Sequence, residues 1–170
     1  MNDRPGEFDL IGKYFKPLAS AESGAGELSN DAAVLSPKQG HRLVVTMDTL
    51  VSGVHFLEFT PPHFIAAKTL RVNLSDLAAM GAEPAWYTLS LSLPSGGDGI
   101  YGDDWLDSFA QALQVEQAIY GITLVGGDTV ATPGPLSLSI TAMGWVKTGQ
   151  DMKRSNAKPG DIICVSGQIG

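Results

Sequence analysis

The stretch Leu124-Val125-Gly126-Gly127-Asp128-Thr129 constrains how the rest of this chain can be arranged. The apolar run Ile122–Val125 predicts a short buried strand, and two glycines and a carboxylate follow it directly. Because glycine has no Cβ, a ligand can approach the backbone closely at the end of such a strand. Glycine and aspartate are also ordinary turn residues. The stretch alone therefore leaves two interpretations open, a plain turn and a ligand-binding turn.

The composition is typical of one soluble globular domain, with 170 residues, 44% of them hydrophobic and 17% charged. No apolar run approaches the roughly 20 residues that span a bilayer, and the polar N-terminus has no signal-peptide core. The net charge of −7 argues against nucleic acid as a partner, since phosphate backbones are bound by clustered Lys and Arg. The one cysteine, Cys164, lies in an apolar run and is expected to be buried. We expect a cytoplasmic protein that binds neither nucleic acid nor a membrane.

Hydrophobic periodicity and turn residues together predict the order of helices and strands. The predicted helices cover residues 5–18, 60–80 and 105–120. The predicted strands cover residues 30–35, 41–48, 86–93, 122–125, 136–146 and 162–166. The Ser-, Gly- and Ala-rich residues 19–30 predict a mobile loop. This order predicts an α+β fold, a mixed, mainly antiparallel sheet with two main helices packed on one face.

Polar residues at the predicted helix starts have the types that cap helices. Thr60 is expected to cap the helix over residues 60–80. Asp103 and Asp104 look like paired catalytic carboxylates, but they precede the helix over residues 105–120. Acidic residues suit the positive end of a helix dipole, so we expect them to cap that helix.

Asp76 lies inside a predicted helix that is apolar nearly all round and is therefore expected to be buried. A buried carboxylate costs several kcal/mol unless it is paired or bound to a metal. Asp76 could cap a neighbouring backbone or pair with the nearby cations Lys68 and Arg71. The helix alone leaves these structural roles and a metal ligand equally open.

Four aspartates share an unusual setting, because each stands directly after or inside an apolar element: Asp31, Asp48, Asp76 and Asp128. Mg²⁺ prefers oxygen ligands, usually a few carboxylates with waters and substrate phosphates. Phosphoryl transfer relies on such positioning and charge neutralisation. The sequence has no zinc spacing, no nucleophile elbow, no dinucleotide fingerprint and no Walker loop. Carboxylates that converge on Mg²⁺ are the remaining catalytic interpretation.

Five motifs resemble the thiamine-monophosphate kinase family, within the aminoimidazole-ribonucleotide-synthetase superfamily. They are Asn-Asp-Ala-Ala-Val-Leu (30–35), Thr-Met-Asp-Thr-Leu-Val-Ser-Gly-Val-His-Phe (46–56), Val-Asn-Leu-Ser-Asp-Leu-Ala-Ala-Met-Gly-Ala (72–82), Gly-Gly-Asp-Thr (126–129) and Arg-Ser-Asn-Ala-Lys-Pro-Gly-Asp (154–161). They occur in the family's order over nearly the whole chain. The fold that the resemblance implies is that of the superfamily's N-terminal domain.

The resemblance implies transfer of the ATP γ-phosphoryl group to thiamine monophosphate, which gives thiamine diphosphate without a covalent enzyme intermediate. The implied Mg²⁺ ligands are Asp31, Thr46, Met47, Asp48, Asp76 and Asp128. By the same resemblance, His55 contacts the thiamine phosphate, while Gly127, Asp128 and Arg154 contact ATP. The family pairs into a homodimer through its sheets, and Trp86, Tyr87 and Trp145 are either anchors of that interface or ordinary core residues.

Three departures from the family pattern qualify these expectations. Asn30 stands where the family usually has a first aspartate, so the metal role stays with Asp31. Met47 stands where Thr or Ser is common, and a thioether is a poor Mg²⁺ ligand, so only its backbone carbonyl could serve. The third departure is length, since these 170 residues stop about where the family's second α/β domain should begin.

We therefore expect three parts: an N-terminal helix and loop (1–30), an ATP- and Mg²⁺-binding domain (31–166) and the start of a linker (167–170). Little kinase activity is expected from these 170 residues alone. Two alternatives stay open. One is another enzyme of the superfamily, of the cyclo-ligase or selenophosphate-synthetase type. The other is a non-catalytic domain that dimerises and binds nucleotide.

Overall fold

The computed structural model describes residues 6–95, 100–165 and 167. The helical elements are α1 (Glu7–Leu10), η1 (Ile11–Phe15), η2 (Lys16–Ala19), η3 (Ser23–Leu28), α2 (Pro62–Ala79), α3 (Asp103–Tyr120) and η4 (Arg154–Asn156). The strands are β1 (His41–Val51), β2 (Glu83–Pro94), β3 (Thr123–Thr132) and β4 (Ser137–Lys147). No helix among the described residues combines the length and apolar character needed to cross a bilayer.

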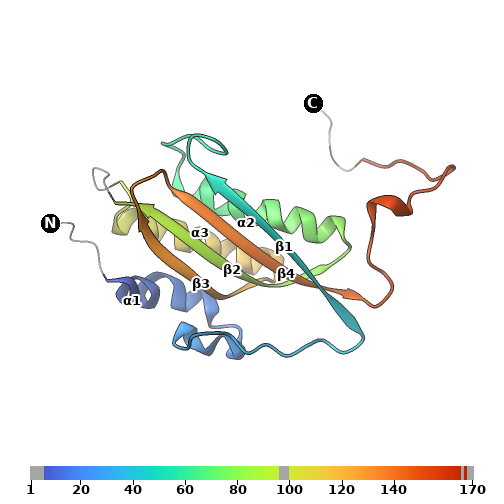
Figure 1. Cartoon of the computed structure of the whole chain (residues 1–170), viewed down its shortest axis with the longest axis horizontal. Helices are drawn as coiled ribbons and strands as arrows, with labels where there is room; N and C mark the ends of the chain where they lie inside the picture. Colours follow the sequence, from blue (N-terminus) through green and yellow to red (C-terminus); the bar gives the residue numbers. More distant parts are fainter. Residues whose placement is uncertain (1–5, 96–99, 166, 168–170) are drawn as a thin grey trace.

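The four strands form one sheet in the order β1-β4-β2-β3 (Figure 1). β4 pairs antiparallel with both β1 and β2, whereas β2 and β3 are parallel because α3 crosses over between them. The two long helices, α2 and α3, both cover the same face (Figure 1). The predicted α+β fold, a mixed and mainly antiparallel sheet with two helices on one face, is confirmed.

The hydrophobic core lies between this sheet face and the two helices. Alternate strand residues, such as Tyr87, Leu89 and Ile140, point into it and meet Leu70 and Phe109 from the helices. Burial of such side chains stabilises each by about 1.5–3 kcal/mol, which explains why the apolar pattern alone predicted these elements. Tyr87 belongs to this core and is fully buried, so its alternative role as an interface anchor is wrong.

The opposite face of the sheet is covered only at its β3 side, where Ala25 and Leu28 of η3 pack with Val125 and Trp86, and no described helix covers its β1 side. Leu43, Val45 and Met47 point outward from β1, and Met47 is 63% exposed. Trp86 and Trp145 lie half-buried on the same face, with ring centroids 5.4 Å apart in an edge-to-face contact. This open face is apolar along β1 and aromatic at one end of the β2–β4 pair.

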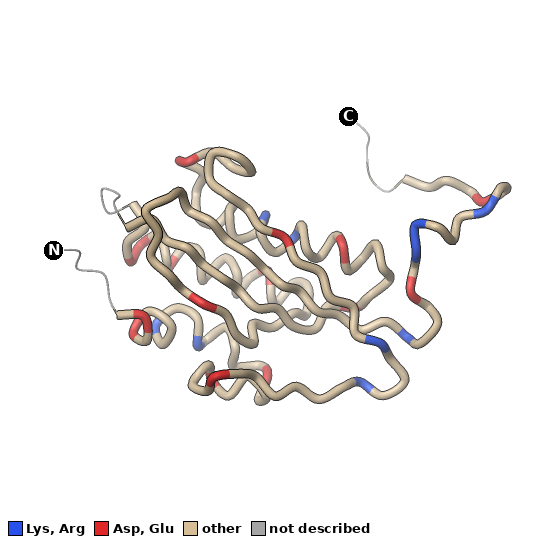
Figure 2. Tube along the Cα trace, viewed as in Figure 1, with Lys and Arg blue, Asp and Glu red and all other residues tan. Residues whose placement is uncertain are grey.

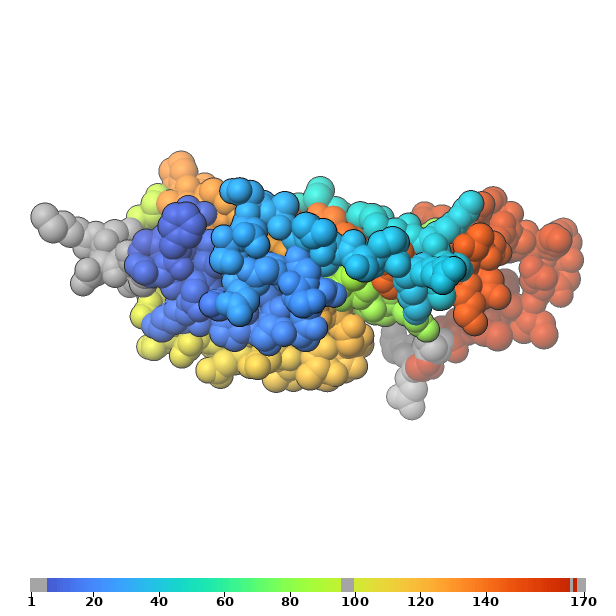
Figure 3. Space-filling model, turned by 90° about the horizontal axis from the view of Figure 1, so that it is seen from below, coloured from blue at the N-terminus to red at the C-terminus, as the bar shows by residue number. Residues whose placement is uncertain are grey.

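The N-terminal segment is helical from Glu7 to Ala19, as predicted for residues 5–18, although residues 1–5 lie outside the described part. It packs beside β3 and α3, where Figure 3 shows it in blue next to the yellow α3. The following residues, predicted as a mobile loop, form the short helix η3, in which Ala25 is buried.

Two predicted strands are wrong. Residues 30–35 are irregular, because their backbone bonds the adjacent 3-10 turn (Val34 N–H to the Gly24 carbonyl, 2.8 Å) and not the sheet. Residues 162–165 are extended but unpaired, with Ile163 93% exposed, since the described chain offers no neighbouring strand (Figure 1). Cys164 in this segment is exposed, so its expected burial is also wrong. Ser166 lies outside the described residues.

The predicted helix caps are wrong at both starts. The N-cap of α2 is Pro61 and that of α3 is Gly102, and neither makes a side-chain cap. Thr60 lies one residue before that N-cap, so its hydroxyl is not at the capping position. Asp103 lies one position inside α3, where its carboxylate still suits the helix dipole and accepts a hydrogen bond from Lys13 (2.8 Å).

Candidate functional site

The Gly126-Gly127-Asp128 stretch lies inside β3, so the predicted turn directly after Val125 is wrong. β3 continues because a bulge between Leu124 and Gly126 resets its register against β2. Parallel pairing with β2 then runs on to Thr132. Sequence reasoning missed this continuation because glycine pairs are usually read as strand ends.

Gly127 is required by the sheet itself. A Cβ at this position would lie 2.0 Å from the Leu89 carbonyl oxygen, whereas a Cβ at Gly126 would make only an ordinary 3.8 Å contact with Thr88 Cγ2. The close approach of β2 therefore explains the second glycine without a ligand. Packing against β2 already excludes a Cβ at residue 127, so a phosphate could contact the Gly127 backbone directly.

A cavity of about 180 Å³ lies between β3 and the N-terminal segment. Asp31 and Asp128 line it together with the backbone of Gly126 and Gly127. Both carboxylates are exposed, and neither has a hydrogen bond or ion pair with another described residue. Two unpaired carboxylates in one cavity form an oxygen-rich site that can accept a hard cation.

A second polar site lies at the β1 edge. The Thr46 hydroxyl donates a 2.7 Å hydrogen bond to Asp76 Oδ2, which joins β1 to α2. Asp48 is two residues further along the same side of β1. These side chains supply three oxygen-bearing groups from two packed elements.

Asp76 is exposed, so the expected burial of its carboxylate is wrong. The alternative in which Asp76 pairs with Lys68 or Arg71 is wrong as well. Arg71 instead binds Glu116 on α3 through two 2.7 Å hydrogen bonds, and Lys68 Nζ contacts the His55 carbonyl oxygen. The charged residues of α2 lie at the edges of the helix, where water reaches them. The buried polar residues of α2 are Thr69 and Asn73.

His55 lies in the exposed turn between β1 and α2. Its Nδ1 accepts a 3.0 Å hydrogen bond from the Val51 backbone N–H. Nδ1 must therefore carry the lone pair, which leaves Nε2 as the ring's N–H donor. The turn thus fixes one tautomer and presents a donor to an anionic ligand on the β1 side of the molecule.

The four aspartates do not meet within one chain. Register pairs Asp48 with Ile140, Ile140 with Leu89 and Leu89 with Gly127, so one row across the sheet links the two sites. Three interstrand spacings separate its ends by about 14 Å. Figure 2 shows the acidic residues in red on separate elements, and no three His, Cys, Asp or Glu of the described part are grouped to hold one metal ion.

Met47, a predicted Mg²⁺ ligand, and Arg154, a predicted ATP contact, lie outside these two aspartate pairs. Met47 points its thioether to the open face, away from the side of Asp48, so only its backbone is available there, as expected. Arg154 stands in η4, within the C-terminal segment that runs away from the sheet (Figure 1). It is exposed and reaches neither aspartate site in this arrangement.

Sequence reasoning missed Gln117, whose side chain joins three elements. Its Oε1 accepts hydrogen bonds from the Tyr87 hydroxyl (3.0 Å) and the Leu124 N–H (3.2 Å), while its Nε2 donates to the Leu18 carbonyl (3.0 Å). Gln117 thereby holds the N-terminal segment beside β3, where the cavity forms. No local pattern marks a glutamine near a helix end for this role.

Residues 29–146 match the family described as "AIR synthase related protein, N-terminal domain". The chain belongs to this family. The thiamine-monophosphate kinase of Caulobacter vibrioides is 46% identical over 98% of this chain and 46% of its own length. The crystal structure of thiamine-monophosphate kinase from Stenotrophomonas maltophilia K279a is 50% identical, with a TM-score of 0.68 over 77% of this chain and 39% of that one.

A second similar structure is AaThiL complexed with AMPPCP and TMP, which is 27% identical. Its TM-score is 0.58 over 84% of this chain and 42% of that one. This chain spans about half the length of the curated relatives it matches. These similarities show the family and the fold of this chain. The activity of the longer relatives is said of those proteins alone.

Proposed function

We propose that this chain forms the nucleotide- and metal-binding part of a thiamine-monophosphate kinase, which transfers the ATP γ-phosphoryl group to thiamine monophosphate. The main support for this proposal is the cavity that the unpaired Asp31 and Asp128 carboxylates line together with the backbone of Gly127. Support also comes from the named relatives and from the neighbour complexed with AMPPCP and TMP.

The donor set fits Mg²⁺. The side chains of Asp31, Thr46, Asp48, Asp76 and Asp128, with the backbone carbonyl of Met47, offer only oxygen ligands. Three of the carboxylates, Asp31, Asp48 and Asp128, have no partner among the described residues, which leaves their oxygens free. Bound Mg²⁺ would neutralise phosphate charge during transfer.

The remaining residues would position the two substrates. Asp128 and the backbone of Gly127 would lie against the ATP phosphates, and Arg154 would join them once its segment is folded against the site. The His55 Nε2–H, oriented by Val51, would donate to the phosphate of thiamine monophosphate. Fixed donors of this kind need no reorganisation at the moment of transfer.

A homodimer through the open sheet faces would bring the two aspartate sites together. Rotation about a two-fold axis parallel to the strands places the β1 edge of one copy over the β3 edge of its partner. Because Asp48 and Gly127 share one row, this rotation keeps them at the same level along the strands. Packed sheets lie about 10 Å apart, and the Asp48 and Asp76 side chains stand on the helix side of β1, so the two sites would meet at the rim of the packed sheets and not between their faces. The exposed Leu43, Val45 and Met47 supply apolar contact area.

Titration calorimetry of the 170-residue chain with AMPPCP tests the metal and nucleotide assignment. Binding that requires Mg²⁺ is expected, together with little conversion of thiamine monophosphate by the chain alone. Binding that is equal with and without Mg²⁺ would refute the metal site. Robust thiamine diphosphate formation would overturn the expectation of low activity.

The non-catalytic alternative shares the binding site and differs in its substrate. If the domain only dimerises and binds nucleotide, we expect no Mg²⁺-dependent affinity for thiamine monophosphate in the presence of AMPPCP. The His55 donor favours the kinase, because it offers a second anion contact on the β1 side. The cytoplasmic location stays a prediction.

A further inference from the structure

The N-terminal helical segment has two apolar stripes. Leu10, Tyr14 and Leu18, at helical spacing, are buried against the helices and sheet. Phe8, Ile11 and Phe15 form the other stripe and line the cavity beside β3, and of these Phe15 is also part of the buried core, with 5% exposure. Phe8 is 87% exposed, although burial of such a ring is worth about 1.5–3 kcal/mol. An aromatic side chain directed at a cavity and left open to water needs an explanation.

The lining of the cavity combines charged and apolar groups. Asp31 and Asp128 supply carboxylates, and the Phe8–Phe15 stripe, with Leu28, supplies apolar side chains. A nucleotide has a similar combination, since a flat base with apolar faces is joined to charged phosphates. Aromatic side chains bind bases by stacking on these faces, whichever base is present.

We propose that the stripe of Phe8, Ile11 and Phe15 binds the purine base of ATP. The assignment rests on the proposed function, because it takes Asp128 as the place of the ATP phosphates. Thiamine monophosphate, the other molecule with an aromatic ring, is assigned to His55, and no residue of the turn that holds His55 lines this cavity. The purine is therefore the occupant that the arrangement favours for this cavity.

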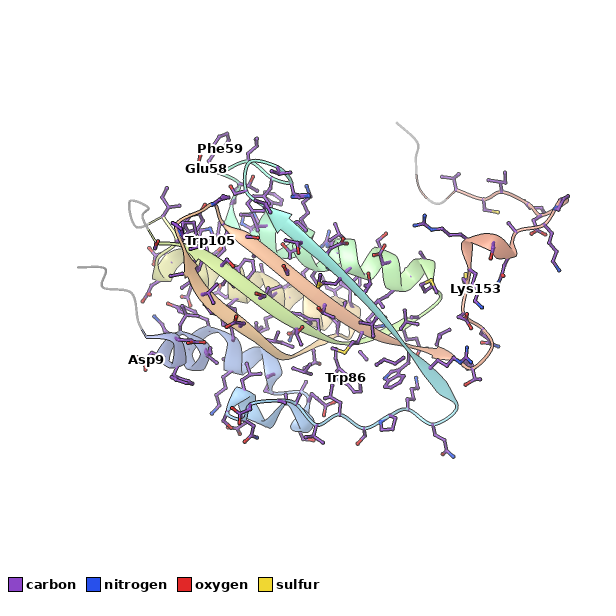
Figure 4. The ribbon with its side chains drawn as sticks, in the orientation of Figure 1. Asp9, Glu58, Phe59, Trp86, Trp105 and Lys153 are labelled. Atoms are coloured by element: carbon purple, nitrogen blue, oxygen red, sulfur yellow. The ribbon has the colours of Figure 1, made fainter. Side chains whose placement is uncertain are left out.

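The experiment compares AMPPCP with inorganic tripolyphosphate, which carries similar charge but no base. Affinities of both, with Mg²⁺, are measured by calorimetry for the wild-type chain and for Phe8→Ala. The control variant is Phe59→Ala, because Phe59 is similarly exposed (83%) but lies in the loop between β1 and α2, away from the N-terminal helix (Figure 4). Both phenylalanines are surface residues, so neither substitution should alter the melting temperature appreciably.

Phe8→Ala is expected to weaken AMPPCP binding by about 5- to 100-fold, the effect of losing one stacked base. Tripolyphosphate binding should not change, and Phe59→Ala should affect neither ligand. An unchanged AMPPCP affinity in Phe8→Ala would overturn the proposal. Equal weakening of both ligands would do so too, since the ring would then act on the phosphate end. A selective loss of thiamine monophosphate binding would reassign the stripe to the other substrate.

Failure of the proposed function would look different. In that case the wild-type chain would bind neither AMPPCP nor tripolyphosphate in a Mg²⁺-dependent way, and Asp128→Asn would change nothing. If the phosphate site exists but the base site does not, Asp128→Asn weakens both ligands while Phe8→Ala weakens neither. The two outcomes separate the base-binding stripe from the phosphate-binding site.

Discussion

The two edges of the sheet carry aspartates in contrasting states. At the β1 edge, Asp76 is already held by the Thr46 hydroxyl, so part of the ligand geometry is built by the chain itself. At the β3 edge, Asp31 and Asp128 share a cavity but no contact with another described side chain. One edge is preorganised and the other is open. Under the proposed function, the β3 edge is the one that a bound cation would complete.

Electrostatics explain why the open edge can exist. Carboxylates that lack a partner are tolerated only where water reaches them, and both Asp31 and Asp128 are exposed. A hard cation that replaces this water binds carboxylates that are not engaged in an ion pair. No ion pair therefore has to be broken when the cation binds. The Thr46–Asp76 pair, by contrast, limits how its carboxylate can turn. The β3 edge should therefore depend more strongly on metal than the β1 edge.

Substitution of a proposed metal ligand at either edge should give the largest effect. Asp128→Asn and Asp48→Asn each remove a charge that no neighbour replaces, and Mg²⁺-dependent AMPPCP affinity should fall by at least about 100-fold, since even residues behind the ligands typically cost 10- to 100-fold. Calorimetry at fixed Mg²⁺ measures this. An affinity within about threefold of wild type in either variant would remove that residue from the site.

Gly127→Ala should destabilise the fold independently of any ligand. Its Cβ would lie 2.0 Å from the Leu89 carbonyl oxygen, and overpacking of this kind typically costs about 1–3 kcal/mol. Urea unfolding without nucleotide measures the loss. Gly126→Ala is the matched control, because its Cβ meets only Thr88 Cγ2 at 3.8 Å. Equal stability of the two variants would show that β2 does not require the second glycine.

Thr46→Val should weaken Mg²⁺ binding by about tenfold, because it keeps the shape of β1 but removes the hydroxyl that orients Asp76. Thr46→Ser retains the hydroxyl and should restore most of the affinity. Titration of both variants with Mg²⁺ and AMPPCP checks the pair. If Thr46→Ser is as weak as Thr46→Val, the methyl group and not the hydrogen bond is what matters.

Asp103→Asn should leave nucleotide binding unchanged, because Asp103 pairs with Lys13 and lies outside both aspartate sites. The pKa of the Asp103 carboxyl is lowered by its hydrogen bond to Lys13. Its contribution to stability is therefore present above the ordinary carboxyl pKa of 3.8 and is lost as the pH falls below that value. A thermal melt series should show a small wild-type advantage at pH 7 that declines as the pH falls below 3.8. Loss of AMPPCP binding would place Asp103 in the site.

The sequence predicted the sheet and both long helices because their apolar periodicity is strong. Alternating residues in β2 and β4, such as Leu89 and Ile140, and the stripe of Phe109 on α3 bury the same faces that the pattern indicated. Contacts between distant segments could not be predicted in this way. The bulge before Gly126, the continuation of β3 and the exposed setting of Asp76 all depend on neighbours far along the chain.

The candidate site was predicted as a set of residues and not as an arrangement. The resemblance singled out Asp31, Asp48, Asp76 and Asp128, but sequence order does not reveal that β1 and β3 occupy opposite edges of the sheet. Gln117 shows the same limit, since its three hydrogen bonds reach residues on three other elements.

In the proposed homodimer, one functional site combines the β1 edge of one copy with the β3 edge of its partner. Co-expression of Asp48→Asn with Asp128→Asn tests it, because a mixed dimer has one doubly altered site and one intact site. Random pairing should then restore about a quarter of the wild-type Mg²⁺-dependent AMPPCP binding capacity. Asp48→Asn with Asp76→Asn, two changes at the same edge, should restore none. Failure of the first mixture to recover any binding, when its dimers are shown to exchange, would contradict the shared site.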